Sequence, residues 1–391
     1  MAGGDGSRRK TGILSLTPSE LRALRRSPQQ PGGAAMQLTR QHNLSVVRRL
    51  LYTHGSLTRP ELAKLSGLSL PTIGGLVTQL IEEGTVKARG IVTEARVGKP
   101  ASRIGMDSER NVSIVLDLTH DDRFRGAIID LDGTIIDRAE VEIGQAFGEA
   151  AVEHAVDLAT LLIERASVQI VGIGIASPGL IDDAGQVHVA DRLQWRDVPL
   201  AETIRRRTGI TTFVGNDVNL LALGLSRFRN RSGRDAIVVA LDNGVGSAVL
   251  EGGEPVLGEQ FAAGEIAHLT VQPDGEICRC GRRGCLDMVV GAPHLARRLE
   301  QEGDRVLEPA GRTLGQALAP IVLVLNTNVV VVVGPERLVV GPFTDGVIDG
   351  LHSRLRPAII EGLTIEVGPN DPDLVLLGAA GIVMESQLGV F

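Results

Sequence analysis

Four side chains that ligate soft or borderline metals gather in one short stretch of this 391-residue chain. His268, Cys278, Cys280 and Cys285 form the pattern H-x9-C-x-C-x4-C, and these three cysteines are all that the sequence has. One imidazole and three thiolates suit Zn²⁺ at a closed tetrahedral site with a structural role. The alternatives are unconnected buried cysteines, or one disulfide with a spare thiol. A clustered odd number of cysteines beside a histidine favours the metal.

Two carboxylates flank these ligands and add a second kind of chemistry. Glu265 precedes His268 by three residues, and Asp287 follows Cys285 by two, so a bound metal would also fix both carboxylates beside a small ligand. The stretch reads GEIAH and then CRCGRRGCLD. It resembles the run GE-x-G-H and C-x-C-G-x-x-G-C-L-E of the ROK family (repressors, open reading frames and sugar kinases). Ala267 stands for a family glycine, and Asp287 stands for a glutamate.

This resemblance implies a sugar site. The run from Asn216 to Asn219 matches the family motif N-D-x-N, whose aspartate acts in the kinases as base toward a sugar hydroxyl, so Asp217 inherits that position. By the same resemblance, sugar hydroxyls would also contact Asn216, Glu265, His268 and Asp287. Asp287 is one methylene shorter than the family glutamate, so its contact is either lost or bridged by water. From the residues alone, Asp217 has the alternative role of a helix cap.

The segments that would hold a nucleotide depart from the family pattern. Family kinases place a D-x-G-G-T loop after the first strand, whereas residues 117–122 read DLTHDD and bring two extra carboxylates. The second phosphate loop is reduced to DNGVGS at residues 242–247, and the adenosine-side glycine pair is Gly334-Pro335. Phosphoryl transfer needs backbone N–H groups and Mg²⁺ around the phosphates. We therefore expect that the ATP site is lost while the sugar site survives, and that the protein is not an enzyme.

Charge divides the chain into a basic front and an acidic body. Residues 1–105 hold 16 Lys and Arg against 6 Asp and Glu, although the whole chain has a net charge of −7. A basic front suggests contact with a polyanion. Residues 1–36 read as a disordered basic tail. The chain shows neither a secretory signal nor a membrane-spanning apolar run, and its cysteines suit a reducing compartment, so we expect a cytoplasmic protein.

Residues 37–105 have the pattern of a winged helix-turn-helix. A first helix is expected at about Asn43–His54, a second begins after Thr58 with a capping box, and a third follows Ser69. Leu62 and Leu65 should face inward. This segment also resembles the N-terminal domain of ROK repressors, whose G-x-P wing motif stands here at residues 98–100. The alternative is a helical protein-interaction module, which the positive charge and the wing argue against.

The expected contacts with DNA lie on the third helix and on the wing. On the helix the exposed residues are small or neutral, so we expect close backbone approach and affinity that comes mainly from phosphates. Arg or Lys on such a wing can enter a minor groove. The expected DNA-binding residues are Ser69, Thr72, Gly74, Thr78, Arg96, Lys99 and Arg103.

Residues 111–391 alternate strands and helices. Three strands, expected at about residues 112–118, 124–130 and 134–143, precede a helix at Glu149–Arg165, and a second similar unit starts at Ala236. A closing strand and helix are expected at Leu374–Met384. The resemblance selects the fold among α/β folds: a duplicated, two-lobed actin/hexokinase-like (ribonuclease H-like) ROK domain, with the zinc site in the second lobe.

These patterns predict a sugar-responsive DNA-binding transcription regulator, acting as a repressor, with a structural Zn²⁺. Its expected partners are an operator in double-stranded DNA, a sugar or sugar-derivative effector, and further copies of itself in a homodimer or homotetramer; no membrane is expected. The alternative is a ROK-type sugar kinase that carries a DNA-binding domain. A third hypothesis is a regulator that has lost its effector.

Overall fold

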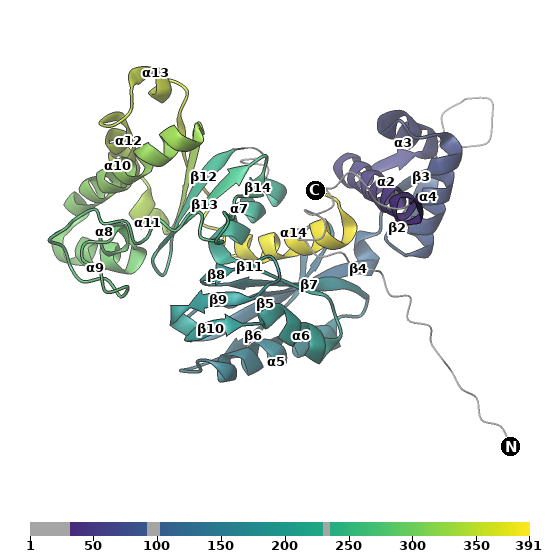
Figure 1. Ribbon diagram of the computed structural model, residues 1–391, viewed down its shortest axis with the longest axis horizontal. Coiled ribbons are helices and arrows are strands. Elements are labelled where there is room, and N and C mark those ends of the chain that lie inside the picture. Colours follow the sequence, from purple (N-terminus) through teal and green to yellow (C-terminus); the bar gives the residue numbers. More distant parts are fainter. Residues whose placement is uncertain (1–31, 92–101, 230–234) are drawn as a thin grey trace.

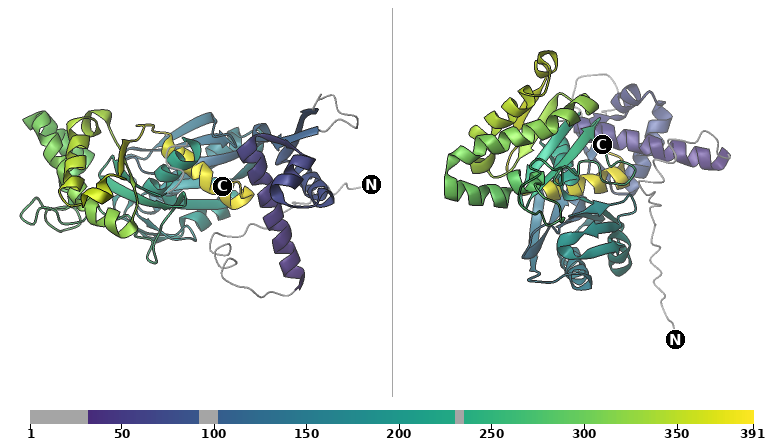
Figure 2. Two further views of the ribbon diagram at one scale, coloured as in Figure 1. Left: turned by 90° about the horizontal axis from the view of Figure 1, so that it is seen from above. Right: turned by 60° about the vertical axis from the view of Figure 1, so that its left-hand side comes forward.

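The computed structural model describes residues 32–91, 102–229 and 235–391 of the chain. Three bodies follow one another in it: a winged-helix domain, a first α/β lobe and a second α/β lobe (Figure 1). One long helix near the end of the chain runs back between them, and Figure 2 shows the same arrangement from two other sides. Among the described residues, no helix is long and apolar enough to cross a membrane.

The winged-helix domain consists of three helices and a small antiparallel sheet. Its helices are α2 (Gly32–His54), α3 (Arg59–Ser66) and α4 (Leu70–Glu82), and its strands pair in the order β1 (Ser56–Thr58), β3 (Ser102–Met106), β2 (Val86–Ile91). Thr58 and Glu61 form the predicted capping box of α3, and the Ser69 side chain accepts the Thr72 N–H at the start of α4. The helix-turn-helix is therefore built by the residues that predicted it.

Two details of this domain differ from the expectation. Helix α2 begins at Gly32 rather than at about Asn43, so residues 32–36 belong to a helix and not to the tail; residues 1–31 lie outside the described residues. Leu62 is fully buried as predicted, but Leu65 is half exposed. An eight-residue helix turns only part of its surface toward the domain core, and Leu65 falls outside that part.

The first lobe is a five-stranded mixed sheet with helices against it. Its strand order is β11 (Thr212–Asn216), β7 (Gln169–Ser177), β4 (Asn111–Asp117), β5 (Arg123–Asp130), β6 (Ile135–Glu142). The hairpin strands are antiparallel and the remaining pairs are parallel. Helices α5 (Glu149–Arg165) and α6 (Leu200–Thr208) bury their apolar faces on it, and a small sheet of β8 (Leu180–Ile181), β9 (Val187–Ala190) and β10 (Trp195–Val198) adjoins them.

The second lobe repeats this plan. Its strand order is β14 (Glu254–Pro255), β13 (Val245–Glu251), β12 (Ala236–Leu241), β15 (Val329–Val333), β16 (Thr364–Val367), again with an antiparallel hairpin followed by parallel pairs. Its helices are α8 (Leu286–Val290), α9 (Ala292–Glu302), α10 (Leu307–Leu325), α11 (Glu336–Val339), α12 (Pro342–His352) and α13 (Pro357–Ile360). The repeated strand order confirms the predicted duplicated fold.

Helices α7 (Asp217–Phe228) and α14 (Leu374–Leu388) lie together at the centre of the molecule (Figure 1). They are in backbone contact: a Cβ on Gly378 would lie 1.8 Å from the Leu220 carbonyl oxygen, and one on Gly224 would lie 2.1 Å from that of Leu374. The predicted strand within Leu374–Met384 is wrong, since the whole run is helix. A helix buried on nearly all sides reads as a continuous apolar run, which sequence alone does not separate from a buried strand.

Candidate functional site

The predicted zinc ligands come together in the second lobe. One ligand atom from each of His268, Cys278, Cys280 and Cys285 lies within 4.8 Å of the other three. Cys278 and Cys285 are buried, His268 is half buried and Cys280 is exposed. The sequence spacing therefore identified a set of side chains that does converge.

The donor set has the dimensions of a tetrahedral zinc site. The sulfurs of Cys280 and Cys285 are 3.6 Å apart, and the Cys278 sulfur is 3.6 Å from Nδ1 of His268. Zinc bonds of about 2.3 Å to sulfur and about 2.0 Å to nitrogen at tetrahedral angles give ligand separations of about 3.5–3.8 Å. These two separations match that range, and the remaining ones lie within 4.8 Å, so the four side chains are close enough to hold Zn²⁺.

Tight backbone turns hold the ligands in place. Residues 267–271 pair with residues 284–287, through bonds that include Leu286 N–H to the Leu269 carbonyl and Asp287 N–H to the Ala267 carbonyl. Gly284 has φ of +63°, and a Cβ there would lie 1.4 Å from the Gln272 carbonyl oxygen, so only glycine fits. The segment between the ligands is thus fixed by its own hydrogen bonds as well as by any bound ion.

The first lobe supplies Asp217 and Asn216 at the start of α7. The Asn216 carbonyl Oδ1 accepts the N–H groups of Val218 and Asn219, and its Nδ2 donates to the Gly179 carbonyl at 3.1 Å. Asn216 therefore caps the helix and ties the neighbouring turn, so its side chain is already engaged within the protein. Asp217 lies in the first turn, and Asn216, not Asp217, is the cap residue.

Asp217 lies in an unfavourable environment for a charged carboxylate. Its pKa is raised to about 7, mainly by burial, and the negative charges of Asp117 and Glu265 act in the same direction; a backbone hydrogen bond with Val218 and the positive charge of Arg192 act against the rise. Glu265 belongs to the second lobe, so Asp217 interacts electrostatically with a carboxylate of the other lobe. A carboxyl group that titrates near neutral pH can donate or accept a proton toward a bound hydroxyl.

Glu265 and His268 come from the second-lobe segment that also holds the predicted metal ligands. Partial desolvation raises the pKa of Glu265, although its side chain keeps contact with solvent, and the nearby His268 lowers it. His268 turns Nδ1 toward the Cys278 sulfur, which leaves Nε2 as a second hydrogen-bonding atom. One imidazole can therefore ligate a metal and orient a ligand at the same time.

Asp287 is placed differently from the other four predicted sugar contacts. Its side chain is 4% exposed, and its Oδ1 accepts the N–H of Val245 at 3.0 Å. A Cβ on Gly244 would lie 2.8 Å from the same oxygen. Asp287 thus stabilises the β12–β13 turn. We interpret its side chain, which is shorter than the family glutamate, as a support for that turn.

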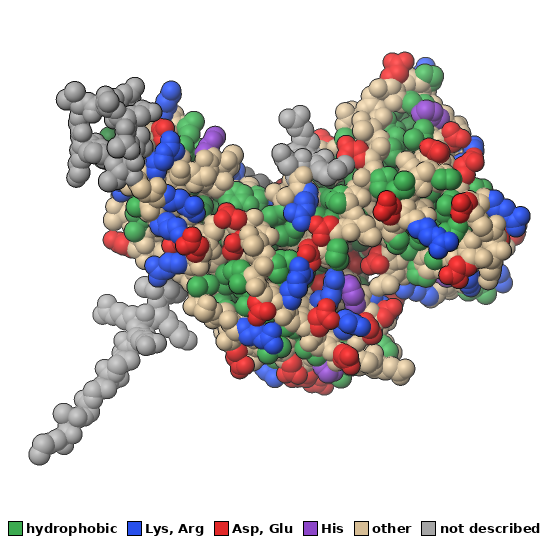
Figure 3. Space-filling view, turned by 180° about the vertical axis from the view of Figure 1, so that it is seen from behind, with side chains coloured by type: hydrophobic (Ala, Val, Ile, Leu, Met, Phe, Trp, Pro, Cys, Tyr) green, Lys and Arg blue, Asp and Glu red, His purple; other side chains and the backbone are tan. Residues whose placement is uncertain are grey.

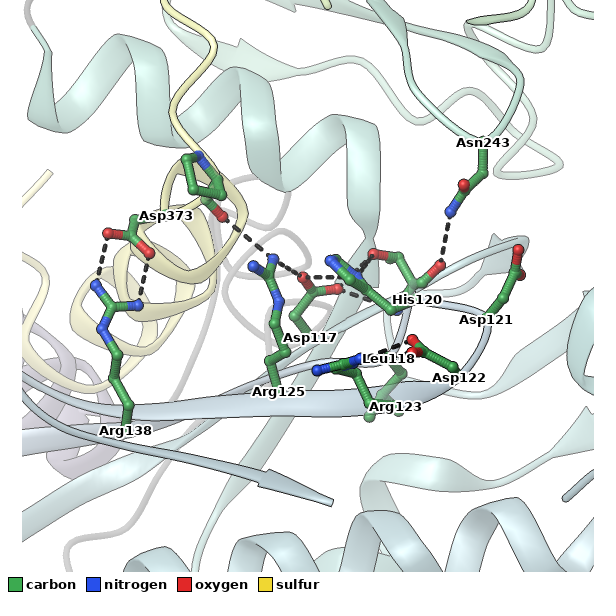
Figure 4. A network of polar contacts seen from close by, with 12 residues as sticks. Asp117, Leu118, His120, Asp121, Asp122, Arg123, Arg125, Arg138, Asn243 and Asp373 are labelled. Carbon is green, nitrogen blue, oxygen red and sulfur yellow. Dashed lines mark hydrogen bonds and ion pairs between the residues drawn. The ribbon is translucent and has the colours of Figure 1, made fainter. Parts of the chain in front are cut away.

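Residues 117–122 of the first lobe and residues 242–247 of the second lobe are tied together by side chains (Figure 4). Asp117 is fully buried: its Oδ1 accepts the N–H and the hydroxyl of Thr119, and its Oδ2 accepts Arg125 Nη2 at 2.6 Å. His120 lies 3.6 Å from the same Oδ2. Asn243 of the second lobe donates Nδ2 to the Thr119 carbonyl at 3.3 Å.

The expected DNA contacts are only partly within the described residues. Arg96, Lys99 and the wing tip at residues 98–100 lie outside them. Arg103 lies at the base of the wing, where its Nη1 donates to the Ser56 carbonyl and its Nη2 lies 3.9 Å from Glu61. Arg103 therefore links the sheet to α3 within the domain.

Three of the expected residues at α4, namely Ser69, Thr72 and Thr78, are exposed on its outer side, and Gly74 is half buried. The hydroxyls of Ser69 and Thr72 are 2.8 Å apart, and the Thr78 hydroxyl donates to the Gly74 carbonyl. Among the described residues, no atom lies within 4 Å of a Cβ built on Gly74 or on Gly75. The domain itself therefore does not require glycine at either position. Figure 3 shows Lys and Arg side chains gathered at this end of the molecule.

Sequence reasoning missed Arg125 and Arg192, which supply positive charge between the lobes. Arg125 is a strand residue that neutralises Asp117, and Arg192 lies 3.0 Å from Asp121 and donates to the Leu118 carbonyl at 3.2 Å. Neither belongs to a short motif. Asp121, which pairs with Arg192, is exposed, so the acidic residues at 121–122 were only a weak signal of that arginine and no signal of Arg125.

The chain belongs to the ROK family, to which residues 119–337 match. It is similar to the DNA-binding transcriptional dual regulator NagC of Escherichia coli K12, with 26% identity over 78% of this chain and 84% of that protein. It is also similar to the xylose repressor of Bacillus subtilis, with 23% identity over 88% of this chain and 96% of that one. A glucokinase of Thermotoga maritima is 28% identical over 54% of this chain and 79% of its own length.

Solved structures agree on the fold. A ROK family transcriptional regulator described as a homologue of the E. coli MLC protein superimposes with a TM-score of 0.79 at 19% identity, over 90% of this chain and 98% of that one. A ROK family glucokinase from Streptomyces griseus gives a TM-score of 0.58 at 22% identity, over 69% of this chain and 98% of that one. The ROK architecture thus extends over both lobes.

Proposed function

We propose that this protein is a sugar-responsive transcriptional repressor. In this proposal the winged helix binds an operator in double-stranded DNA, and the ROK domain binds a sugar or sugar derivative. The supporting observation is that the two regulators named above, NagC and the xylose repressor of Bacillus subtilis, align with 78% and 88% of the chain, whereas the Thermotoga maritima glucokinase aligns with 54%. Effector and DNA would favour different arrangements of the two parts, so that binding of one weakens binding of the other.

In the proposed effector site, Asp217, Glu265 and His268 contact the ligand. They come from both lobes, and they include the carboxyl group whose pKa of about 7 suits hydrogen bonds in either direction. Asn216 and Asp287 position the helix start and the β12–β13 turn rather than touching the ligand, because their side-chain atoms already bond within the protein. A structural Zn²⁺ on His268 and the three cysteines would fix the second-lobe half of the site.

A degenerate nucleotide site is the second part of the proposal. Both Asp117 oxygens are engaged, by Thr119 and by Arg125, so neither is free to position Mg²⁺. The Asn243 bond to Thr119 also closes the two loops on each other. A triphosphate would have to break a buried ion pair, and removing one partner of such a pair costs about 3–5 kcal/mol.

The sugar kinase is the alternative function, and the carboxyl group of Asp217 at the position of the family base favours it. An ATP-coupled assay over hexoses, pentoses and amino sugars separates the two. The repressor proposal expects no turnover above the no-sugar control, and turnover at ordinary enzymatic rates would refute it. Calorimetry of the same sugars on wild type and Asp217→Ala tests the third hypothesis, a regulator without an effector, which expects no binding to either.

For the DNA interface we propose that α4 enters the major groove with its backbone close to the bases. Gly74 and Gly75 weaken a helix by roughly 1 kcal/mol each relative to alanine, yet nothing among the described residues crowds them. Their small size therefore serves an external surface. We also propose a homodimer or homotetramer, because a helix-turn-helix dimer presents two recognition helices to the half-sites of a palindrome.

A single experimental series tests the main proposal. Duplexes that the protein selects from a random pool define its site, and a thermal-shift screen of sugars and sugar phosphates finds stabilising ligands. Each stabilising ligand is then added to a mobility-shift assay. A ligand that raises the melting temperature and releases DNA supports the proposal. A protein that selects no DNA sequence contradicts it.

The wing is tested separately by charge reversal. Arg96→Glu with Lys99→Glu should lower affinity for the selected duplex broadly, with a shallower salt dependence, because phosphate contacts release counterions. Arg305→Glu, on an exposed side chain of the second lobe, is the matched control. Unchanged DNA affinity in the wing variant would remove the wing from the interface.

A further inference from the structure

The winged-helix domain rests on residues at the other end of the described chain. Met384, Leu388 and Val390 belong to the same apolar core cluster as Leu44 and Val47 of α2. Buried Arg48 donates Nη1 to the Leu388 carbonyl at 3.4 Å, and its Nη2 pairs with Glu83 at 2.8 Å. The end of α14 is therefore part of the core of the DNA-binding domain.

Phe391 lies where three parts of the molecule meet. Its ring packs edge-on against Tyr52 of α2, with centroids 5.1 Å apart, and against Phe228 of α7, with centroids 5.9 Å apart. The guanidinium carbon of Arg227 lies 4.5 Å from the Phe391 ring centroid. One aromatic ring thus touches both the DNA-binding domain and the end of α7.

Arg227 extends this contact into the second lobe. Its side chain is 4% exposed, and its Nη2 lies 2.7 Å from Glu254 of β14 and 2.7 Å from Glu385 of α14. A buried guanidinium with two carboxylates and an aromatic ring is held in one orientation. Movement of the second lobe at Glu254 therefore acts directly on the residue that supports Phe391.

Helix α7 connects this contact to the proposed effector site. It begins at Asp217 and ends at Phe228, a length of roughly 18 Å at 1.5 Å per residue. Its backbone touches that of α14 at Gly224 and Gly378, so at these two points no side chain separates the helices, and close packing leaves little room for one helix to shift against the other. If the start of α7 moves, α14 should therefore move with it, including the end of α14 that packs against the winged-helix domain.

We propose that α7 and α14 form one connecting body, and that Arg227 and Phe391 are the positioning residues through which the state of the effector site sets the seating of the DNA-binding domain. This inference rests on the proposed function only for naming one end of the path an effector site and the other a DNA-binding domain. The contacts of Arg227 and Phe391 are present whether or not a sugar or DNA binds. The coupling would therefore depend on side chains that contact neither the effector nor DNA.

The test uses Tyr52, which is the only tyrosine of the chain. Full-length protein grown with 3-fluorotyrosine gives a single ¹⁹F resonance that reports the packing of α2 on Phe391. Phe391→Ala should move this resonance toward that of free 3-fluorotyrosine by more than the line width. Phe147→Ala, at a half-exposed ring of the first lobe, is the control and should leave it in place. An unmoved resonance in Phe391→Ala would overturn the docking contact.

Coupling is tested by a double-mutant cycle at the two ends of α7. Asp217→Asn should shift the Tyr52 resonance in otherwise wild-type protein, and Phe391→Ala should at least halve that shift. Equal shifts in both backgrounds, or none in either, would overturn the coupling. Phe391→Leu, which keeps an apolar side chain, serves if the alanine variant unfolds, and emission from the single buried Trp195 reports folding.

The outcome is separable from that of the proposed function. The ¹⁹F cycle contains neither sugar nor DNA, so it can succeed where the sugar screen fails. Conversely, a sugar that binds wild type and Phe391→Ala equally in calorimetry, but releases selected DNA only from wild type, supports both proposals. Release of DNA from both proteins at the same sugar concentration refutes the connecting role alone.

Discussion

Replacing Asp217 by asparagine should stabilise the protein, and the gain should depend on pH. Burial raises the pKa of this carboxyl group from 3.8 to about 7. Between these two values the folded state holds a proton that the unfolded state has lost, so stability falls as pH rises through the window. The penalty is absent below about pH 4 and complete above about pH 7. Asparagine carries no charge at any of these pH values and escapes it.

The magnitude follows from the width of the window. A difference of about 3 pKa units at 1.36 kcal/mol each sets an upper limit of about 4 kcal/mol. Asp217 is intermediate in solvent exposure, so water reduces the cost of its charge. We therefore expect about half of that limit, about 2 kcal/mol. At about 2 °C per kcal/mol for a chain of this size, Asp217→Asn should melt about 4 °C above wild type at pH 8.5.

The assay is thermal unfolding by circular dichroism at pH 5.0 and pH 8.5, on wild type and variant. The difference between the proteins should be larger at pH 8.5 than at pH 5.0. Asp157→Asn, at an exposed position in the middle of α5, is the control and should show no pH-dependent difference. A melting difference for Asp217→Asn that is the same at both pH values would refute the argument that burial destabilises the charged form.

Three further predictions concern metal, charge and DNA. Cys285→Ser should lower the zinc content, measured by plasma mass spectrometry, well below the one ion per chain expected of wild type, because it removes a buried thiolate; stoichiometric zinc in the variant would contradict the site. Arg125→Ala should cost about 3–5 kcal/mol in urea unfolding because it strands buried Asp117, and Arg125→Lys should cost less; equal losses would contradict the charge argument. Gly74→Ala should stabilise α4 by about 1 kcal/mol and weaken binding to the selected duplex, whereas unchanged DNA affinity would place α4 away from the groove.

Local signals in the sequence predicted much of this fold. Capping residues at Thr58 and Ser69 located two helices, and the spacing of the metal ligands located the zinc stretch. These succeed because each depends on contacts within a few residues. The boundaries of α5 were likewise those expected at Glu149–Arg165. The choice of the ROK fold came from family resemblance rather than from such patterns.

Long-range contacts account for what the sequence did not reveal. Leu374–Met384 was expected to contain a strand because burial on all sides removes helical periodicity. Arg125 takes its role from Asp117 on the adjacent strand, and Asp287 takes its role from Val245, which lies 42 residues away. No motif records such pairings, since they arise only when separate segments are brought together.

The bond from Arg48 to Leu388 joins residues 340 positions apart. The winged-helix domain is synthesised before α14, yet part of its apolar core is completed only by the end of that helix. At about 5–20 residues per second, synthesis of the intervening chain takes roughly 20–70 seconds. Throughout that interval the nascent domain exposes an apolar surface that chaperones can bind. Slow codons in this gene would prolong that exposure and so lower the yield of native protein.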